Sequence, residues 1–241
     1  MSPPRPVRAI AFDLFHTLVD PEEFRPKEFL RYREIARLLQ LPLAEFERFW
    51  IETEKPRQLT RVPNTTERVR QFCIEHGISP PAEGWSRVAE IVGRYARLAI
   101  ARPRDRIVDS LRDLRERGVV LGLLSNCEGG EIDTWPRSPL AGFFDATVFS
   151  CDVGFAKPSI EAYRALVPRW GDVPLKAAAF VGDGANDELP GARRAGFRVA
   201  IFDSEFVAQN GLRRPEANDR IRRDGDATIQ TLAELPVLLG L

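Results

Sequence analysis

An excess of charge of either sign is missing from this sequence. The 241 residues include 35 lysine and arginine residues and 35 aspartate and glutamate residues, so the formal net charge is zero. Proteins that hold nucleic acid or an anionic membrane surface by electrostatics usually carry a basic surplus. The balance argues against both kinds of partner, and we expect a small-molecule substrate.

Long apolar runs are missing too. No stretch approaches the roughly 18 consecutive apolar residues of a membrane-spanning helix. Residues 1–6 include three prolines and lack the hydrophobic region of a signal peptide. We therefore expect a cytoplasmic protein without a membrane partner, and the sequence carries no signal for its oligomeric state.

Cysteine is scarce. Cys73, Cys127 and Cys151 are an odd number of thiols at wide and unmatched spacings. This pattern argues against a disulfide framework and against a zinc site. We expect reduced thiols that mostly serve as packing residues, Cys127 included.

Lysine is rare among the basic residues, with four lysines against 31 arginines. One of the four, Lys157, lies in a turn at residues 154–158. An ammonium group is a compact charge that can touch two acceptors, which a planar guanidinium does less well. A turn lysine is otherwise simply solvated, so its interpretation depends on its neighbours.

Five short apolar runs indicate the fold. They predict strands at residues 7–12, 119–124, 146–149, 177–181 and 198–202. Helical patterns separate the later runs, at 107–117, 160–169 and 187–195. Uninterrupted apolar strands of this kind suit a parallel sheet that is covered on both faces. The sequence therefore predicts an α/β protein with a doubly wound, Rossmann-like parallel sheet.

More than 100 residues separate the first two predicted strands, far beyond a usual crossover. The segment 21–98 reads as helical, with apolar residues at helical spacing and a helix start at Asn64 and Glu67. Its prolines predict a division into four helices. We expect a smaller all-helical domain at 21–98, inserted into a core formed by 1–20 and 99–241.

The first predicted strand ends on an acid. Asp13 follows the apolar run, and Thr17 lies four residues later. Open parallel sheets place their chemistry at the carboxyl ends of the strands, so Asp13 is a candidate nucleophile. Aspartate also favours helix and turn caps. A residue that only caps a helix or turn, however, does not require polar or charged residues at the ends of other strands.

Three further segments place polar or charged residues at or near the ends of other predicted strands. They contain Ser125 with Asn126, Lys157, and Asp183 with Asp187. Taken alone, the first pair is an ordinary turn, and Asp187 could cap the helix that begins beside it.

Asp13 and Asp183, at adjacent strand ends, could together hold Mg²⁺, a hard cation that takes oxygen ligands. Phosphoryl transfer requires positive charge, hydrogen-bond donors and an in-line nucleophile. Asp13 would then attack phosphorus and form an aspartyl-phosphate that water later hydrolyses.

In this order the four segments resemble the motifs of the haloacid dehalogenase superfamily, and they span nearly the whole chain. The resemblance implies a helical cap that is inserted after the first motif and closes over the active site. It implies that Asp13 is the nucleophile and that Ser125 and Lys157 position the phosphoryl group. Thr17 and Asn126 are the candidate substrate contacts.

The same resemblance implies the metal ligands. These are Asp13, Asp183, Asp187 and the backbone carbonyl of Phe15. Arginines of the inserted segment are candidates to contact an anionic leaving group, although most are expected to be solvated. The candidates are Arg57, Arg61, Arg94 and Arg97.

The first motif departs from the family pattern. Family phosphatases usually read Asp-x-Asp-Gly-Thr, and Phe15 and His16 replace the second Asp and the Gly here. That acid protonates the leaving oxygen and later activates water, which is typically worth about 10² to 10⁴ in rate. A phenyl ring does neither. His16 is the nearest replacement, because an imidazole titrates near neutral pH.

This departure keeps two alternatives open. Haloacid dehalogenases also carry an aromatic residue there, but they place Ser where this chain has Asp183, and paired carboxylates are poor neighbours for a carboxylic-acid substrate. A catalytically silent binding protein is the other alternative, against which the retained motif residues argue. The sequence therefore predicts a magnesium-dependent phosphohydrolase for a small phosphorylated metabolite.

Overall fold

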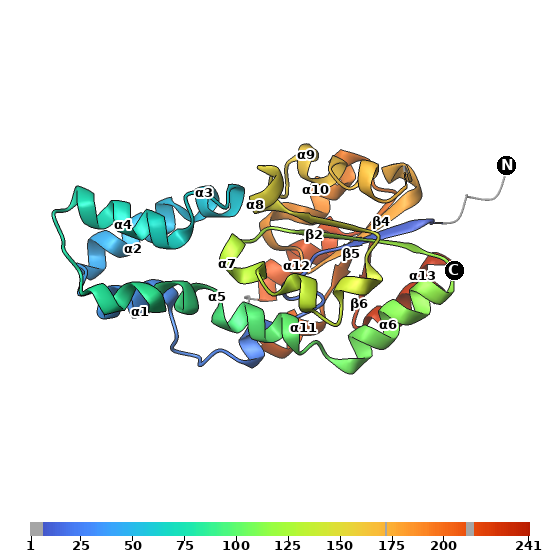
Figure 1. The fold of residues 1–241 in the computed structure, drawn as a ribbon. Helices are drawn as coiled ribbons and strands as arrows, with labels where there is room; N and C mark the ends of the chain where they lie inside the picture. Colours follow the sequence, from blue (N-terminus) through green and yellow to red (C-terminus); the bar gives the residue numbers. More distant parts are fainter. Residues whose placement is uncertain (1–6, 172, 211–214) are drawn as a thin grey trace.

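A computed structural model describes residues 7–171, 173–210 and 215–241. Six parallel strands form one sheet in the order β3-β2-β1-β4-β5-β6 (Figure 1). The strands are β1 (Ala9–Phe12), β2 (Val120–Ser125), β3 (Ala146–Phe149), β4 (Ala178–Gly182), β5 (Val199–Asp203) and β6 (Ala227–Ile229). The strand order reverses beside β1, which is where open α/β sheets bind their ligands.

Both faces of the sheet are covered, because successive side chains of each buried strand point to opposite sides. In β1, Ile10 and Phe12 pack into one apolar cluster, whereas Ala9 and Ala11 pack into another. The first cluster takes side chains from α6 (Asp105–Glu116) and α13 (Leu235–Leu239), and the second from α9 (Ile160–Arg164), α10 (Glu188–Ala195) and α12 (Pro215–Asp224). The predicted doubly wound parallel sheet is confirmed.

Two details of the core differ from the prediction. The strand β6 is not among the predicted ones, because three residues with a central threonine make no apolar run. The helix predicted at 160–169 is split into α9 and a short 3-10 turn, Val167–Arg169. Pro168 lies in that turn and lacks the N–H group that a continuous helix would use.

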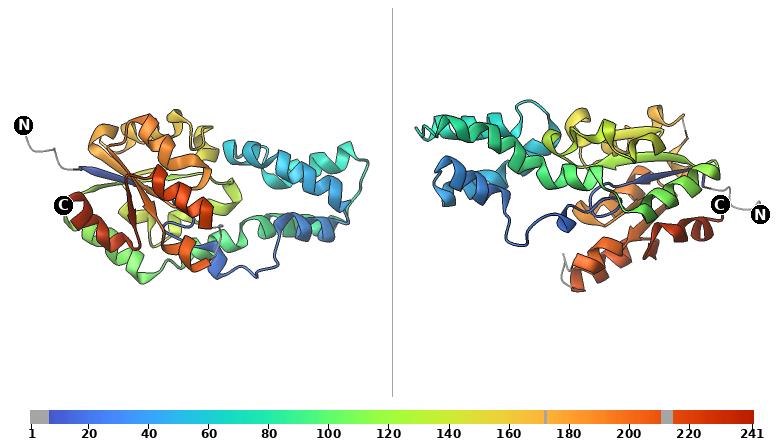
Figure 2. Two further views of the ribbon diagram at one scale, coloured as in Figure 1. Left: turned by 180° about the vertical axis from the view of Figure 1, so that it is seen from behind. Right: turned by 60° about the horizontal axis from the view of Figure 1, so that its bottom comes forward.

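The inserted segment is helical and has an apolar cluster of its own; it is called the cap segment, or cap, below. Its helices are α1 (Arg31–Leu39), α2 (Leu43–Glu52), α3 (Glu54–Leu59), α4 (Thr65–Glu75) and α5 (Trp85–Ala101). Phe46 and Phe72 are fully buried in this cluster, with ring centroids 5.2 Å apart. The cap projects from one end of the core (Figures 1 and 2).

The expectation of four cap helices is wrong, since five are present. The expected break near Pro56 is present, because α2 ends at Glu52 and Pro56 lies in the first turn of α3, where the missing N–H has no helical partner to lose. The helix start at Asn64 is confirmed, because its side chain and that of Glu67 form a reciprocal capping box. The boundaries 1–20, 21–98 and 99–241 stay a prediction, and the last one falls inside α5.

Short helices complete the described part of the chain. They are α7 (Gly129–Ile132) and α8 (Ser150–Val153), which follow β2 and β3, and α11 (Glu205–Asn210), which follows β5. Within the described ranges, none of the helices combines the length and the apolar character needed to cross a lipid bilayer.

Candidate active site

Asp13 and Lys157 meet at the carboxyl edge of the sheet. The backbone N–H of Asp13 donates to the carbonyl of Val181 at 2.9 Å, which extends the pairing of β1 with β4. The Lys157 ammonium donates to the Asp13 carboxylate and to Glu188 Oε2, the latter at 2.6 Å. All three charged side chains are buried. The predicted nucleophile and lysine are therefore in direct contact.

Three carboxylates gather around this contact. Asp13, Asp183 and Glu188 are buried, and one oxygen from each lies within 4.8 Å of the others. Burial raises the pKa of Asp13 and of Glu188, and the Lys157 ammonium opposes only part of that effect. Burial would lower the pKa of Lys157, but the neighbouring Asp13 and Glu188 raise it overall. Three carboxyl groups thus share one ammonium, and burial opposes the ionisation of two of them.

The chemistry of this donor set fits a hard divalent cation. Such ions take carboxylate oxygens as ligands, and they supply the positive charge that a buried group of acids lacks. Asp13 and Asp183 are both among the predicted metal ligands.

Asp187 is not brought into the cluster. Its carboxylate is largely exposed and accepts a hydrogen bond from Arg220 at 2.5 Å. The residue has a left-handed backbone, with φ 52°. Glu188, the next residue, points inward instead and also accepts the N–H of Gly184 at 2.8 Å. The sequence signal was the acidic pair itself, but a linear pattern does not tell which member faces the core.

Two hydroxyl groups at this edge have no hydrogen-bond partner within the described structure. They belong to Thr17 and Ser125, whose side chains are fully buried. A buried hydroxyl without a partner costs roughly 1–3 kcal/mol, so such groups usually indicate a missing ligand or water. Both residues are sequence-predicted site residues, and both have a free donor for an oxyanion.

Asn126 is engaged with the chain around Lys157. Its Nδ2 donates to the Lys157 carbonyl at 2.9 Å, and its Oδ1 accepts the Lys157 N–H at 2.8 Å. The amide therefore positions the lysine, and the sequence had suggested a substrate contact. The two roles are compatible because Asn126 also lines the cavity beside Asp13.

Phe15 and His16 lie beside the carboxylate cluster. Both line a cavity of about 120 Å³ that also contains Asp13, Lys157 and Asp183. His16 has a left-handed backbone with φ 61°, and its Nδ1 lies 3.1 Å from Asp20 Oδ1. Burial, the largest single effect, lowers the pKa of His16, but the hydrogen bond to Asp20 and the charges of nearby carboxylates together raise it overall.

Larger spaces adjoin this cavity under the cap. A cleft of about 810 Å³ lies between the cap segment 51–59 and the core segment 154–159, and it shares Asn126 and Lys157 with the small cavity. A second space, of about 200 Å³, shares Phe15, His16 and Asn126 with it. Gln58 of the cap lines both of these larger spaces. The carboxylate cluster is thus reached from beneath the cap.

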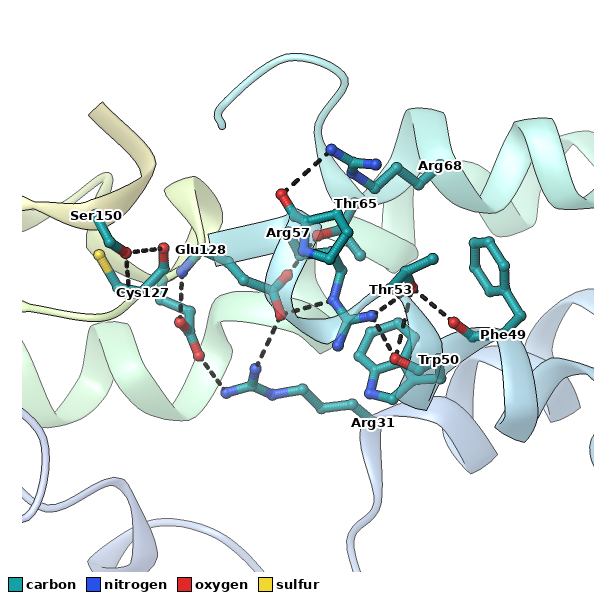
Figure 3. A network of polar contacts seen from close by, with 12 residues as sticks. Arg31, Phe49, Trp50, Thr53, Arg57, Thr65, Arg68, Cys127, Glu128 and Ser150 are labelled. Carbon is teal, nitrogen blue, oxygen red and sulfur yellow. Dashed lines mark hydrogen bonds and ion pairs between the residues drawn. The ribbon is translucent and has the colours of Figure 1, made fainter. Parts of the chain in front are cut away.

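A buried ion-pair network joins cap and core (Figure 3). Arg57 of α3 donates to Glu128 at 2.9 Å and stacks on the Trp50 ring, with its guanidinium carbon 4.0 Å from the ring centroid. Thr65 of α4 donates to the same carboxylate. Arg31 of α1 donates to Glu131 at 2.5 Å. Glu128 and Glu131 also form the capping box of α7, just beyond Asn126.

Most of the four candidate cap arginines contact core residues where the cap meets the core. Arg57 is buried, unlike the solvated surface position that was expected for most of these arginines. Arg61 pairs with Asp133 and Asp152 of the core, and Arg97 donates to the Gly130 carbonyl at 2.8 Å. Arg94 lies on the surface near Glu90. Three of these arginines therefore contact the core.

A Rossmann-like α/β core with a buried carboxylate cluster at the carboxyl edge of its sheet defines the class of protein. A family model described as haloacid dehalogenase-like hydrolase matches residues 7–196. The chain belongs to this family of hydrolases, and the resemblance noted from the motifs is confirmed.

Curated relatives include enzymes of two kinds. A glyceraldehyde 3-phosphate phosphatase from Methanothermobacter thermautotrophicus is 33% identical over 126 residues, which are 48% of this chain and 54% of that protein. This match spans only about half of the relative's length. An (S)-2-haloacid dehalogenase from Pseudomonas sp. (strain YL) is 31% identical over 196 residues, 79% of this chain and 80% of that protein.

Solved structures agree on the fold. A haloacid dehalogenase-type (HAD) phosphatase from Thermococcus onnurineus superposes with a TM-score of 0.61 at 23% identity, covering 97% of this chain and 98% of that one. At this identity the likeness shows the fold alone.

Proposed function

We propose that this hydrolase is a magnesium-dependent phosphohydrolase that acts on a small phosphorylated metabolite. The observation that carries the proposal is the buried cluster of Asp13, Asp183 and Glu188 beside a single lysine. Such a site repels an anionic substrate unless a cation is held there, and phosphoryl groups are commonly bound through Mg²⁺.

The cluster residues would hold the ion together with the backbone carbonyl of Phe15. Glu188 takes the place that the motif had suggested for Asp187. When bound, Mg²⁺ supplies positive charge for the carboxylates and for the phosphoryl oxygens.

Asp13 is the nucleophile in this proposal. Its carboxylate oxygen forms a bond to phosphorus, the ester P–O bond breaks, and the electron pair leaves on the substrate oxygen. The Lys157 ammonium touches the Asp13 carboxylate and favours its ionised form. The free hydroxyls of Ser125 and Thr17 donate to phosphoryl oxygens, and water then hydrolyses the aspartyl-phosphate.

The leaving oxygen needs a proton that Phe15 cannot supply. His16 is the candidate donor, because its ring lines the same 120 Å³ cavity as Asp13 and is held by Asp20. If so, His16→Ala slows alkyl phosphates, which are poor leaving groups, more than aryl phosphates. An equal effect on both classes would remove His16 from this role.

A 2-haloacid dehalogenase is the second candidate, favoured by the 79% coverage of the dehalogenase match and by the aromatic Phe15. In that reaction Asp13 attacks carbon and halide leaves without metal. Against it stand Asp183 and Glu188, which would confront a carboxylate substrate with two further buried acids.

One panel separates the candidates. Phosphate release from a set of phosphoesters and halide release from 2-haloacids are measured with Mg²⁺ and with a chelator. Wild type should release phosphate only with Mg²⁺, and Asp13→Asn should reduce release to background. Phe15→Asp should speed poor leaving groups, by up to about 10² to 10⁴. Halide release that a chelator does not diminish would overturn the proposal.

A further inference from the structure

Two cysteines that lie far apart in the sequence meet beside the candidate active site. Cys127 Sγ and Cys151 Sγ are 3.9 Å apart, although 24 residues separate them along the chain. Both are free and buried, with exposed fractions of 0% and 5%. The third thiol, Cys73, is buried in the cap cluster, away from this pair.

The sheet explains why they meet. Ser125 of β2 pairs with Phe149 of β3, and each cysteine lies two residues beyond its member of that pair. The end of β2 and the start of α8 therefore bring the two sulfur atoms to 3.9 Å from each other. The Ser150 hydroxyl accepts the Cys127 N–H at 3.0 Å and holds the two segments in this register (Figure 3).

We propose that Cys127 and Cys151 form an intramolecular disulfide when the protein meets a peroxide, so that the pair is a site of reversible oxidative modification. The sulfur atoms must approach from 3.9 Å to the bonded distance of about 2.05 Å. Cys127 is adjacent to Asn126, and Cys151 precedes the loop of Lys157. The bond therefore links the two segments that the Asn126–Lys157 hydrogen bonds already join.

The chemistry takes two steps. The Cys151 thiolate attacks one peroxide oxygen, the O–O bond breaks, and a sulfenic acid and hydroxide result; the hydroxide takes up the proton that the Cys151 thiol had released and becomes water. The sulfur of Cys127 then attacks the sulfenic sulfur, the S–O bond breaks, and a second water leaves with the Cys127 proton. Two thiols are oxidised by two electrons, and one peroxide is reduced.

The environments of the two thiols suit this order. Cys151 is the more exposed, and the hydrogen bond from Cys127 lowers its pKa. Burial raises the pKa of Cys127 well above its ordinary value. The thiolate is the reactive form, so Cys151 attacks the peroxide and is oxidised first, and Cys127 resolves the sulfenic acid.

Thiol counting tests the proposal without reference to any enzymatic activity. Reduced full-length protein is treated with a small molar excess of hydrogen peroxide, unfolded in guanidinium with N-ethylmaleimide, and weighed by mass spectrometry. Untreated protein should take three maleimides and oxidised protein one, on Cys73. Dithiothreitol should restore three. Trypsin cleaves at Arg137, between the two cysteines, so the linked peptides are held together by the disulfide alone.

Matched variants assign the bond. Cys73→Ser should fall from two maleimides to none, whereas Cys151→Ser should keep both of its thiols free of any linkage. Three reactive thiols after peroxide, a linkage that includes Cys73, or a covalent dimer would each overturn the proposal. Wild-type protein alone gives these readings, so poor folding of a variant does not remove the test.

Discussion

The side chain of Asn126 and the backbone of Lys157 hold each other through two hydrogen bonds, 2.9 and 2.8 Å long. The first residue follows β2 and the second lies beyond β3, so the contact joins the loops of two neighbouring strands. Through it, the ammonium that touches Asp13 is fixed by a residue that carries no charge. This contact and three other features of the structure, namely the carboxylate cluster, the buried Asp203 and the Arg57–Glu128 pair, each lead to a prediction.

Removal of the Asn126 amide should loosen Lys157. We expect Asn126→Ala to lower kcat for phosphate release by roughly 10- to 100-fold, as small displacements in an active site do. Asn126→Asp keeps an acceptor for the Lys157 N–H but loses the donor, so its effect should be intermediate. Steady-state kinetics measure both variants, and circular dichroism serves as the folding control. Wild-type kcat in Asn126→Ala would show that the contact has no positioning role.

Metal binding should depend on Glu188 and not on Asp187. At about 100 times its dissociation constant, Mg²⁺ should stabilise the wild type by about 2.7 kcal/mol, which raises Tm by roughly 5–10 °C in a chain of this size. Glu188→Gln should lose most of that rise, because it removes a buried carboxylate of the cluster. Asp187→Asn should keep it, since its carboxylate lies on the surface with Arg220.

Thermal melting with Mg²⁺ and with a chelator measures this pair of variants without any substrate. The reverse order, with Asp187→Asn losing the Mg²⁺ response and Glu188→Gln keeping it, would assign the ligand to the residue that the sequence motif suggested.

Asp203 should make stability depend on pH. Burial at the end of β5 raises the pKa of Asp203 to about 7, whereas the unfolded value is about 3.9. The stability that the protonated carboxyl provides is therefore present below pH 4 and is lost as pH rises through 7. At roughly 1.4 kcal/mol per pKa unit, the loss is at most about 4 kcal/mol.

The variant Asp203→Asn imitates the protonated group and keeps an acceptor for the Glu205 N–H. We expect it to be more stable than wild type at pH 8 and to lose most of that advantage at pH 5. Urea unfolding at both pH values measures the difference. Glu116→Gln, on the exposed surface of α6, is the matched control. A difference that does not change with pH would contradict the assignment.

Removing only one partner of the Arg57–Glu128 ion pair should lower the free energy of unfolding. Both side chains are nearly inaccessible, 3% and 7% exposed. Arg57→Met keeps an apolar stem near Trp50 but leaves the carboxylate without its main partner, which typically destabilises by about 3–5 kcal/mol. The double variant with Glu128→Gln should recover a large part of that loss. Urea unfolding of the four proteins of the cycle measures the coupling, and additive losses would show that none exists.

Much of the fold could be predicted from local patterns alone. Apolar runs without polar alternation indicate buried parallel strands, and a long helical stretch between the first two indicates an insertion. The capping box at Asn64 and Glu67 is likewise local, because its two partners lie three residues apart. Strand ends also place Asp13, Ser125 and Asp183 at one edge, since parallel strands share their carboxyl ends.

Other features were decided only by the tertiary structure. Asp187 and Glu188 are adjacent acids, and the left-handed backbone of Asp187 with the start of α10 turns the second one inward. Arg57 is buried because a carboxylate and an indole ring from other segments surround it. Cys127 and Cys151 meet because β2 and β3 pair in one particular register. Sequence periodicity indicates which face of its own helix or strand a residue occupies. The contacts above depend instead on how separate elements pack against one another.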